Sequence, residues 1–212
     1  MITPGDTWTF STNDNPEIMF CVWVLRRDGL RVPPFDRHGD GDGALRAAGL
    51  TAENWSAWFA AVIAEVAGRD RGFRARAVEQ VTAGLGARVM PPEPHRSALD
   101  RWPGPAALRR ELTALDAVHR SERRERKARF HDEFQRRAGD AARAERSHQL
   151  WRDIQRHRPL PPLFFYLVDY PEPVSVVAPP DAAVLGGVGT VAGSGPTYDR
   201  LVLDAAAQLS GR

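Results

Sequence analysis

Six apolar residues recur at helical spacing within residues 52–67, and they constrain the fold more than any other feature of the chain. They are Trp55, Trp58, Phe59, Val62, Ile63 and Val66. Such spacing places them on one face of an α-helix, which predicts a surface helix packed on a core. The glycine-rich segment before it predicts a loop and a short helix, ALRAAG, that ends at Gly49. Thr51 is the expected N-cap of the long helix.

Apolar runs near both ends of the chain predict β-strands. We expect strands at residues 7–10, 18–25, 163–170 and 174–178, with a short partner strand at residues 30–32. The run IMFCVWVL at residues 18–25 is apolar throughout, as in a central strand covered on both faces, although periodicity alone does not exclude a buried helix. Because the runs resemble one another, we expect the N- and C-terminal strands to share one small mixed sheet.

Further helices are expected to cover this sheet. The helix at residues 52–67 should end at Gly68, and a second one at residues 73–85 would complete a helical hairpin. A final helix at residues 198–209 has four apolar residues at positions that would point inward: Leu201, Val202, Ala205 and Leu209.

The longest helical signal lies at residues 106–157, between proline-rich breaks at residues 90–95 and 102–105 and a third break at residues 159–162. Its apolar seam is thin, and between Val118 and Phe130 the sequence is almost wholly polar. Acidic and basic residues alternate there at i, i+4 spacing, which stabilises an exposed helix. We therefore expect a projecting charged arm. A helical hairpin broken near residues 138–140 is favoured over one unbroken rod, and both remain open.

These elements predict an α+β fold with a long charged helical arm inserted in the middle. Residues 1–103 would form the N-terminal part of the core, residues 104–158 the arginine-rich arm, and residues 159–212 the C-terminal strands and helix that complete the core.

Charge is concentrated in the predicted arm. Residues 109–158 hold 15 basic and 9 acidic side chains, whereas the whole chain has a formal net charge of only +2. A basic helix suggests nucleic-acid binding. Acidic residues interleave throughout, however, and no helix-turn-helix, zinc finger or RNA-binding aromatic motif accompanies the arginines. Lys127 is the only lysine among 29 basic residues, a skew that GC-rich coding also produces.

Two glycine-containing loops are candidate ligand sites. Asp40 and Asp42 occupy positions of a calcium-loop pattern whose first and last positions, His38 and Gly49, lack the required carboxylates. A plain connection is therefore the favoured interpretation, with Asp42 or Gly43 starting the short helix. The segment at residues 186–195 has the small residues of an anion-cradling loop, and its candidate anion-binding residues are Gly187, Gly189 and Gly193. It lacks the βαβ context of a nucleotide site, so close backbone packing is favoured.

The sequence contains no coherent catalytic motif. No nucleophile elbow or recognisable triad is present, and the single cysteine, Cys21, lies in an apolar run. Asp116 with His119 and Glu145 with His148 have the i, i+3 spacing of di-iron ligands, but the further carboxylates lack a matching face. We expect no cofactor and no membrane-spanning segment, and the start of the sequence lacks the pattern of a signal peptide, which favours the cytoplasm.

The function that these features favour is a non-enzymatic protein–protein interaction or assembly subunit. Its arm would present six partner-binding residues to another protein or to a second copy: Arg123, Arg124, Arg126, Phe130, Phe134 and Trp151. The first alternative is a nucleic-acid-binding accessory protein that uses the arginine-rich helix. The second is an enzyme of unfamiliar type, with its site at the Asp40/Asp42 loop or at residues 186–195.

Overall fold

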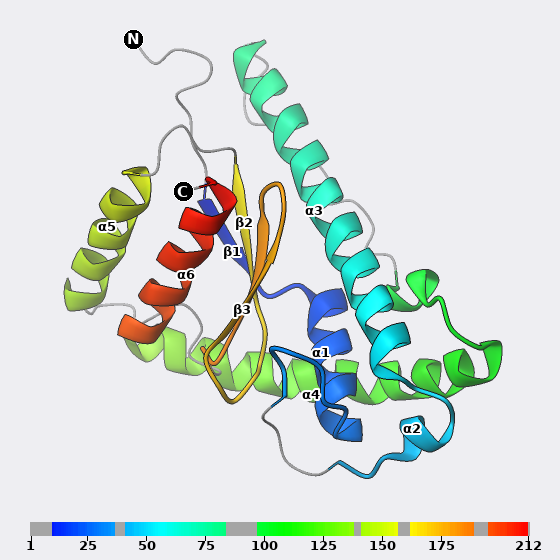
Figure 1. Ribbon diagram of the computed structural model, residues 1–212. Helices are drawn as coiled ribbons and strands as arrows, with labels where there is room; N and C mark the ends of the chain where they lie inside the picture. The colour runs from blue at the N-terminus through cyan, green and yellow to red at the C-terminus, as the bar shows by residue number, and fades with distance from the viewer. Residues whose placement is uncertain are drawn as a thin grey trace.

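The computed structural model describes the chain at residues 10–36, 41–83, 97–137, 141–156, 162–188 and 195–211. A small mixed β-sheet lies at the centre, with helices on both of its faces (Figure 1). The α+β class expected from the sequence is therefore confirmed.

The sheet has four strands from opposite ends of the chain. They are β1 (Phe10–Asn13), β2 (Leu163–Leu167), β3 (Val174–Ala178) and β4 (Ala182–Gly186), in the order β1-β2-β4-β3. Strands β1, β2 and β4 are parallel, and β3 is antiparallel to β4. The prediction that N- and C-terminal strands share one sheet is confirmed by the pairing of β1 with β2. Strand β3 ends the sheet opposite β1.

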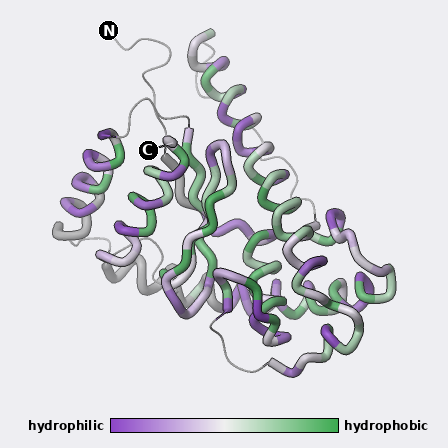
Figure 2. The backbone as a smooth tube through the Cα atoms, viewed as in Figure 1, coloured by the Kyte–Doolittle hydropathy of each residue, from purple (hydrophilic) through white to green (hydrophobic). Residues whose placement is uncertain are grey.

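Alternating side chains divide the core into two parts. From β2, Phe164 and Tyr166 point into the larger cluster, with α1, α3 and α4. Leu163, Phe165 and Leu167 point to the opposite face, toward α5 and α6. Burial on both faces explains why β2 and β4 are apolar along their whole length. The hydrophobic stretches of the tube run through the strands, whereas α5 carries hydrophilic residues on successive turns (Figure 2).

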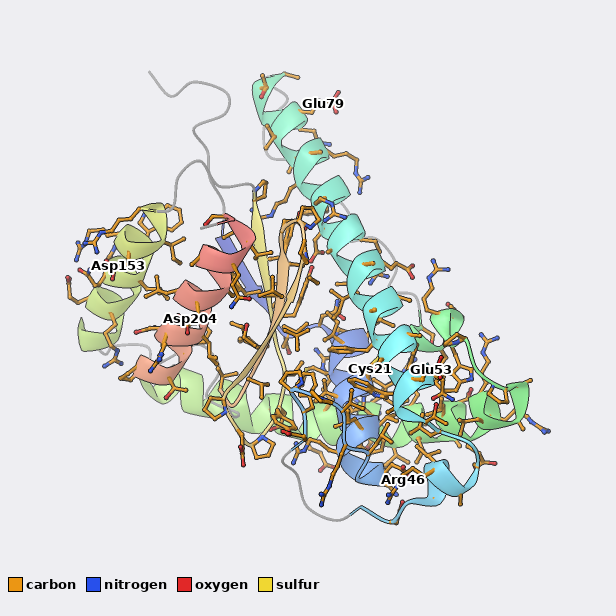
Figure 3. The ribbon with its side chains drawn as sticks, viewed as in Figure 1. Cys21, Arg46, Glu53, Glu79, Asp153 and Asp204 are labelled. Atoms are coloured by element: carbon orange, nitrogen blue, oxygen red, sulfur yellow. The ribbon has the colours of Figure 1, made fainter. Side chains whose placement is uncertain are left out.

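Helices α1 (Pro16–Asp28) and α3 (Ala52–Thr82) form the larger layer, together with α2 (Ala44–Ala47), the 3₁₀-helix η1 (Ala98–Arg101) and α4 (Ala106–Arg137). The predicted tryptophan stripe holds this layer together. Trp55 donates its indole N–H to the carbonyl of Cys21 at 2.9 Å, and Trp58 donates to Ala98 at 2.7 Å. Cys21 lies among the packed side chains between α1 and α3 (Figure 3).

Residues 18–25 belong to α1, so the prediction of a central strand is wrong. Asn15 caps the helix, because its Oδ1 accepts the backbone N–H groups of Glu17 and Ile18 at 2.9 and 3.2 Å. Gly29 ends it with a left-handed φ of 66°. Most of α1 is buried, and its residues 18–25 are apolar throughout, so this stretch has no polar face that would mark it as helical. Residues 30–32 form no partner strand, and Val32 makes an isolated bridge with Phe35. Of the strand expected at residues 7–10, the structure describes only Phe10, which begins β1, and residues 7–9 lie outside the described residues.

Helix α3 continues through Gly68, so the predicted hairpin of two shorter helices is wrong. A glycine inside a helix costs about 1 kcal/mol relative to alanine. Packing of the first half of α3 on α1 and polar contacts from its second half to β2 offset this cost. The short helix α2 and the capping of α3 by Thr51, whose Oγ1 accepts the N–H of Asn54 at 3.2 Å, agree with the sequence.

Residues 106–157 form two helices, with α4 ending at Arg137 and α5 (Ala141–Gln155) following. In the described part of the chain α5 packs beside α6 (Pro196–Leu209), and not along α4 (Figure 1). Leu108 and Leu112 of α4 lie in the larger cluster, and Leu150 and Ile154 of α5 lie in the smaller one. A projecting arm and a separate division at residues 104–158 stay predictions.

Candidate functional site

Strand β3 has the features of a strand that accepts another chain. It is the last strand of the sheet, and residues 175–178 are only partly buried, whereas β2 and β4 are buried throughout. The outer side of an edge strand presents backbone N–H and C=O groups that have no partner strand. An extended peptide can pair with such groups.

A groove of about 470 Å³ separates β3 from α3. One wall comes from three consecutive residues, Val176, Val177 and Ala178. The groove therefore follows β3, the last strand of the sheet, on the side that faces α3.

The other wall is one face of α3. Ser56, Ala60 and Ala64 lie at its exposed rim, and the buried side chains of Trp55, Phe59, Ile63 and Ala67 lie beneath them. The small rim residues leave space above the aromatic floor. From Ser56 to Arg71 this wall runs for about 22 Å at 1.5 Å per residue, the length of about six or seven extended residues.

The turn at residues 32–35 forms one end of the groove. Phe35 is buried there and makes edge-to-face contacts with Phe59 and Tyr170 at centroid distances of 5.7 and 5.1 Å. Such pairs stabilise packing beyond the area that they bury. The aromatic cluster fixes this end of the groove to both α3 and the segment after β2.

An ion pair forms the other end. Arg71 Nη1 lies 2.5 Å from Oδ1 of Asp181, in the turn between β3 and β4. Asp181 is only 2% exposed, while the side chain of Arg71 is 42% exposed. Burial raises the pKa of Asp181 above its usual value, and the nearby Arg71 guanidinium opposes this rise. The buried partner is the carboxylate, and the guanidinium faces the groove.

A polar cluster behind this end fixes the second half of α3 on β2. The hydroxyl of Tyr166 donates to Oδ2 of Asp70 at 2.7 Å, and the Arg74 guanidinium lies over the Phe164 ring at 4.9 Å. Desolvation raises the pKa of Tyr166, and the hydrogen bond to Asp70 raises it further. Desolvation likewise lowers the pKa of Arg74. These contacts hold the helical wall at a fixed distance from the sheet.

A second cavity, of about 450 Å³, lies where α4 crosses the start of α1. Its α4 wall is one helical face formed by Asp116, His119, Arg120, Arg123 and Arg124. His119 is buried against the rings of Phe20 and Trp23 at 5.4 and 5.5 Å. Here the lining charges are largely compensated within the fold. Arg120 pairs with Asp116 at 2.5 Å, Arg123 with Asp14 at 3.0 Å and Arg69 with Glu17 at 2.6 Å.

Of the six predicted partner-binding residues, three have described side chains, and two of these three lie together. Arg123 and Arg124 line the second cavity. Trp151 is 36% exposed on α5 and does not line it. The side chains of Arg126, Phe130 and Phe134 lie outside the described residues.

Where the structure describes them, the residues of the two predicted loop sites have structural roles. Asp42 is exposed, and its Oδ1 accepts the N–H of Ala44 at 3.1 Å, so it starts α2. Gly187 has a φ of 71°, and a Cβ there would lie 2.3 Å from the backbone of Glu172, so close packing requires a glycine. Asp40, Gly189 and Gly193 lie outside the described residues. Within the described ranges, no group of three or more metal-ligating side chains occurs.

Sequence reasoning missed the groove. The available signals were the small residues Ser56, Ala60 and Ala64 at i, i+4 spacing beside the aromatic stripe, and the short run VSVVA. Neither signal shows that β3 is the edge strand, because that depends on β4 inserting between β2 and β3.

The fold and the groove define the class of this protein: an α+β protein with a mixed four-stranded sheet and a groove between its last described strand, β3, and helix α3. Comparisons with models of protein families, with curated proteins and with solved structures find no match. Function is therefore inferred from the geometry of the site. In the ranges that the structure describes, no helix has both the length and the hydropathy to cross a bilayer.

Proposed function

We propose that this protein is a protein–protein interaction module that binds an extended segment of a partner by adding it as a strand to β3. The observation that carries the proposal is the groove, which has three consecutive residues of an edge strand on one side and an aromatic floor under small residues of α3 on the other. This combination suits strand addition, in which main-chain hydrogen bonds supply affinity and alternate side chains enter a groove.

The energetics of such binding follow from the walls. A partner strand beside β3 would turn every second side chain toward α3, over the floor formed by Trp55, Phe59 and Ile63. Each apolar side chain buried there contributes about 1.5–3 kcal/mol before the cost of ordering the partner. Two or three such side chains contribute about 3–9 kcal/mol before those costs, so we expect a Kd that is micromolar or weaker.

We place the partner at the groove and not on the arginine-rich helix. Arg123, which was expected to contact a partner, has only 23% of its side chain exposed and pairs with Asp14. Its guanidinium is therefore already engaged within the fold. In the described part of the chain, the groove combines the last strand of the sheet with an apolar floor, which is why it is favoured. We place the interaction in the cytoplasm, as the sequence led us to expect.

A peptide-display selection tests the proposal. Unbiased peptides displayed on phage would be selected on the folded protein, and the enriched sequences measured by calorimetry. We expect extended sequences with alternating apolar residues. Ala64→Arg at the rim should abolish binding because the long side chain fills the groove. Ala57→Arg, on an exposed part of α3 outside the groove, is the matched control and should leave affinity unchanged.

Main-chain pairing has its own test. Methylation of a peptide nitrogen removes its N–H and blocks strand pairing at that residue. When single N-methyl groups are introduced at successive positions of the peptide, only those at every second position should weaken binding, since only every second N–H would face β3. Binding that is indifferent to both N-methylation and Ala64→Arg would refute strand addition in this groove.

A further inference from the structure

We infer that the groove selects a partner segment that has an acidic side chain at one end of its apolar residues. Arg71 would bind this acidic side chain. The inference rests on the proposed function, because it describes the chemistry of the segment that would lie beside β3. Its evidence is separate, however, and comes from the charged end of the groove.

The accessible charge in the groove is positive. Among the residues that line it, the charged ones are Arg71 and Asp181. Asp181 lies beneath the surface, and Arg71 is the one that a partner would meet. A guanidinium at the end of an apolar groove complements a carboxylate, to which it can donate two parallel N–H groups.

Arg71 is held in place before a partner arrives. Its Nη1 donates to Oδ1 of Asp181, and no further hydrogen bond of its guanidinium is seen among the described residues. The carbonyl of Asp181 accepts the N–H of Phe164 at 2.8 Å, which fixes the turn to β2. A buried carboxylate thus orients an exposed guanidinium from behind and leaves its other N–H groups for a ligand. Asp181 is a positioning residue in this arrangement.

The ligand group is the side chain of Asp or Glu, and not a chain terminus. Helix α3 continues past Arg71 to Thr82, beyond the ion pair at this end of the groove. Among the described residues that line the groove, Arg71 is the single basic one, and a lone guanidinium pairs well with the carboxylate of an Asp or Glu side chain. A partner can therefore run on beyond its acidic residue. The expected pattern is apolar residues at alternate positions, followed two residues later by an acidic one.

The test uses peptides selected on the protein from an unbiased library. The inference expects Asp or Glu to be enriched at one position at the end of the apolar alternation. Changing that residue to its amide should raise the Kd about fivefold to tenfold for the wild-type protein, because one partly exposed charge pair is lost. The same change should have an effect of less than about twofold on Arg71→Gln, since the cation is already absent.

Controls separate this inference from the proposed function. Arg110→Gln, an exposed arginine of α4, should behave as wild type toward both peptides. Amidation of the peptide C-terminus should change the Kd by less than about twofold. If Arg71→Gln does not fold, the Kd values of the acid and amide peptides for the wild-type protein still show whether the groove prefers an acidic side chain.

Three results would overturn the inference. They are selected peptides without an acidic residue, equal affinities for the acid and amide peptides, and loss of binding on amidation of the C-terminus alone. In the first two cases peptides still bind β3, so the proposed function stands. Failure of every peptide to bind in the groove would instead refute the proposed function.

Discussion

Replacement of Asp28 by alanine should destabilise the protein strongly, because this carboxylate connects the end of α1 to the start of α2. Asp28 is 0% exposed, and its Oδ1 accepts the backbone N–H groups of Leu45 and Arg46 at 2.7 and 3.2 Å. Its Oδ2 lies 3.2 Å from Nε of Arg46. Arg46 lies in the segment that leads from α1 toward α3 (Figure 3).

The size of the effect follows from these contacts. A hydrogen bond to a charged group is worth about 1.5–3 kcal/mol, and the alanine variant leaves both N–H groups without that acceptor. The ion pair adds little, because half of the Arg46 side chain is exposed and solvent screens it. We therefore expect Asp28→Ala to lower the free energy of unfolding by about 3–5 kcal/mol, and Asp28→Asn, which keeps one carbonyl acceptor, by about 1–2 kcal/mol.

Urea unfolding followed by circular dichroism measures these changes. The matched control is Asp42→Ala, which removes one hydrogen bond to the N–H of Ala44 from an exposed carboxylate beside the same helix. That variant should lose only about 0.5–1 kcal/mol. The reasoning is refuted if Asp28→Ala costs no more than Asp42→Ala, since burial and the number of hydrogen bonds would then not decide the loss.

The remaining predictions concern pH and two glycines. The raised pKa of Asp181 means that the folded state binds its proton at a higher pH than the unfolded chain. The wild type should therefore gain stability relative to Asp181→Asn as the pH falls through the raised pKa toward the ordinary value of 3.8. Urea titrations at a series of pH values measure this difference, and a gain with rising pH would contradict the prediction. In thermal unfolding, Gly187→Ala should lower Tm because its φ is 71° and its Cβ would clash. Gly68 lies in the interior of α3, and a Cβ added there would have only the Arg71 side chain within 4 Å. Gly68→Ala should therefore raise stability by about 1 kcal/mol, and a loss of stability would contradict this prediction.

Sequence patterns predicted elements whose burial is one-sided or whose ends carry clear signals. The stripe from Trp55 to Val66 and the runs at residues 163–170 and 174–178 correspond to α3, β2 and β3. Residues 18–25 were misassigned because α1 is enclosed by neighbours, and an enclosed helix and an enclosed strand are equally apolar. The cap at Asn15 and the proline after it were the signals that distinguish the two.

The candidate site was beyond the reach of sequence reasoning for a different reason. Strand β4, with its small residues Ala182 and Ala183, gave no strong strand signal, and its insertion beside β2 is what leaves β3 at the edge. The continuity of α3 through Gly68 brings Arg71 to Asp181, and it depends on tertiary contacts such as the hydrogen bond from Tyr166 to Asp70. Local patterns contain neither fact.

Amide hydrogen exchange of β3 with and without a selected peptide tests the central claim most directly. If the peptide adds as a strand, alternate amides of residues 175–178 acquire a new hydrogen bond, and their exchange should slow when peptide is bound. Exchange in the first turns of α4, away from the groove, should stay unchanged. Saturating peptide that leaves the exchange of residues 175–178 as it was would contradict strand addition to β3.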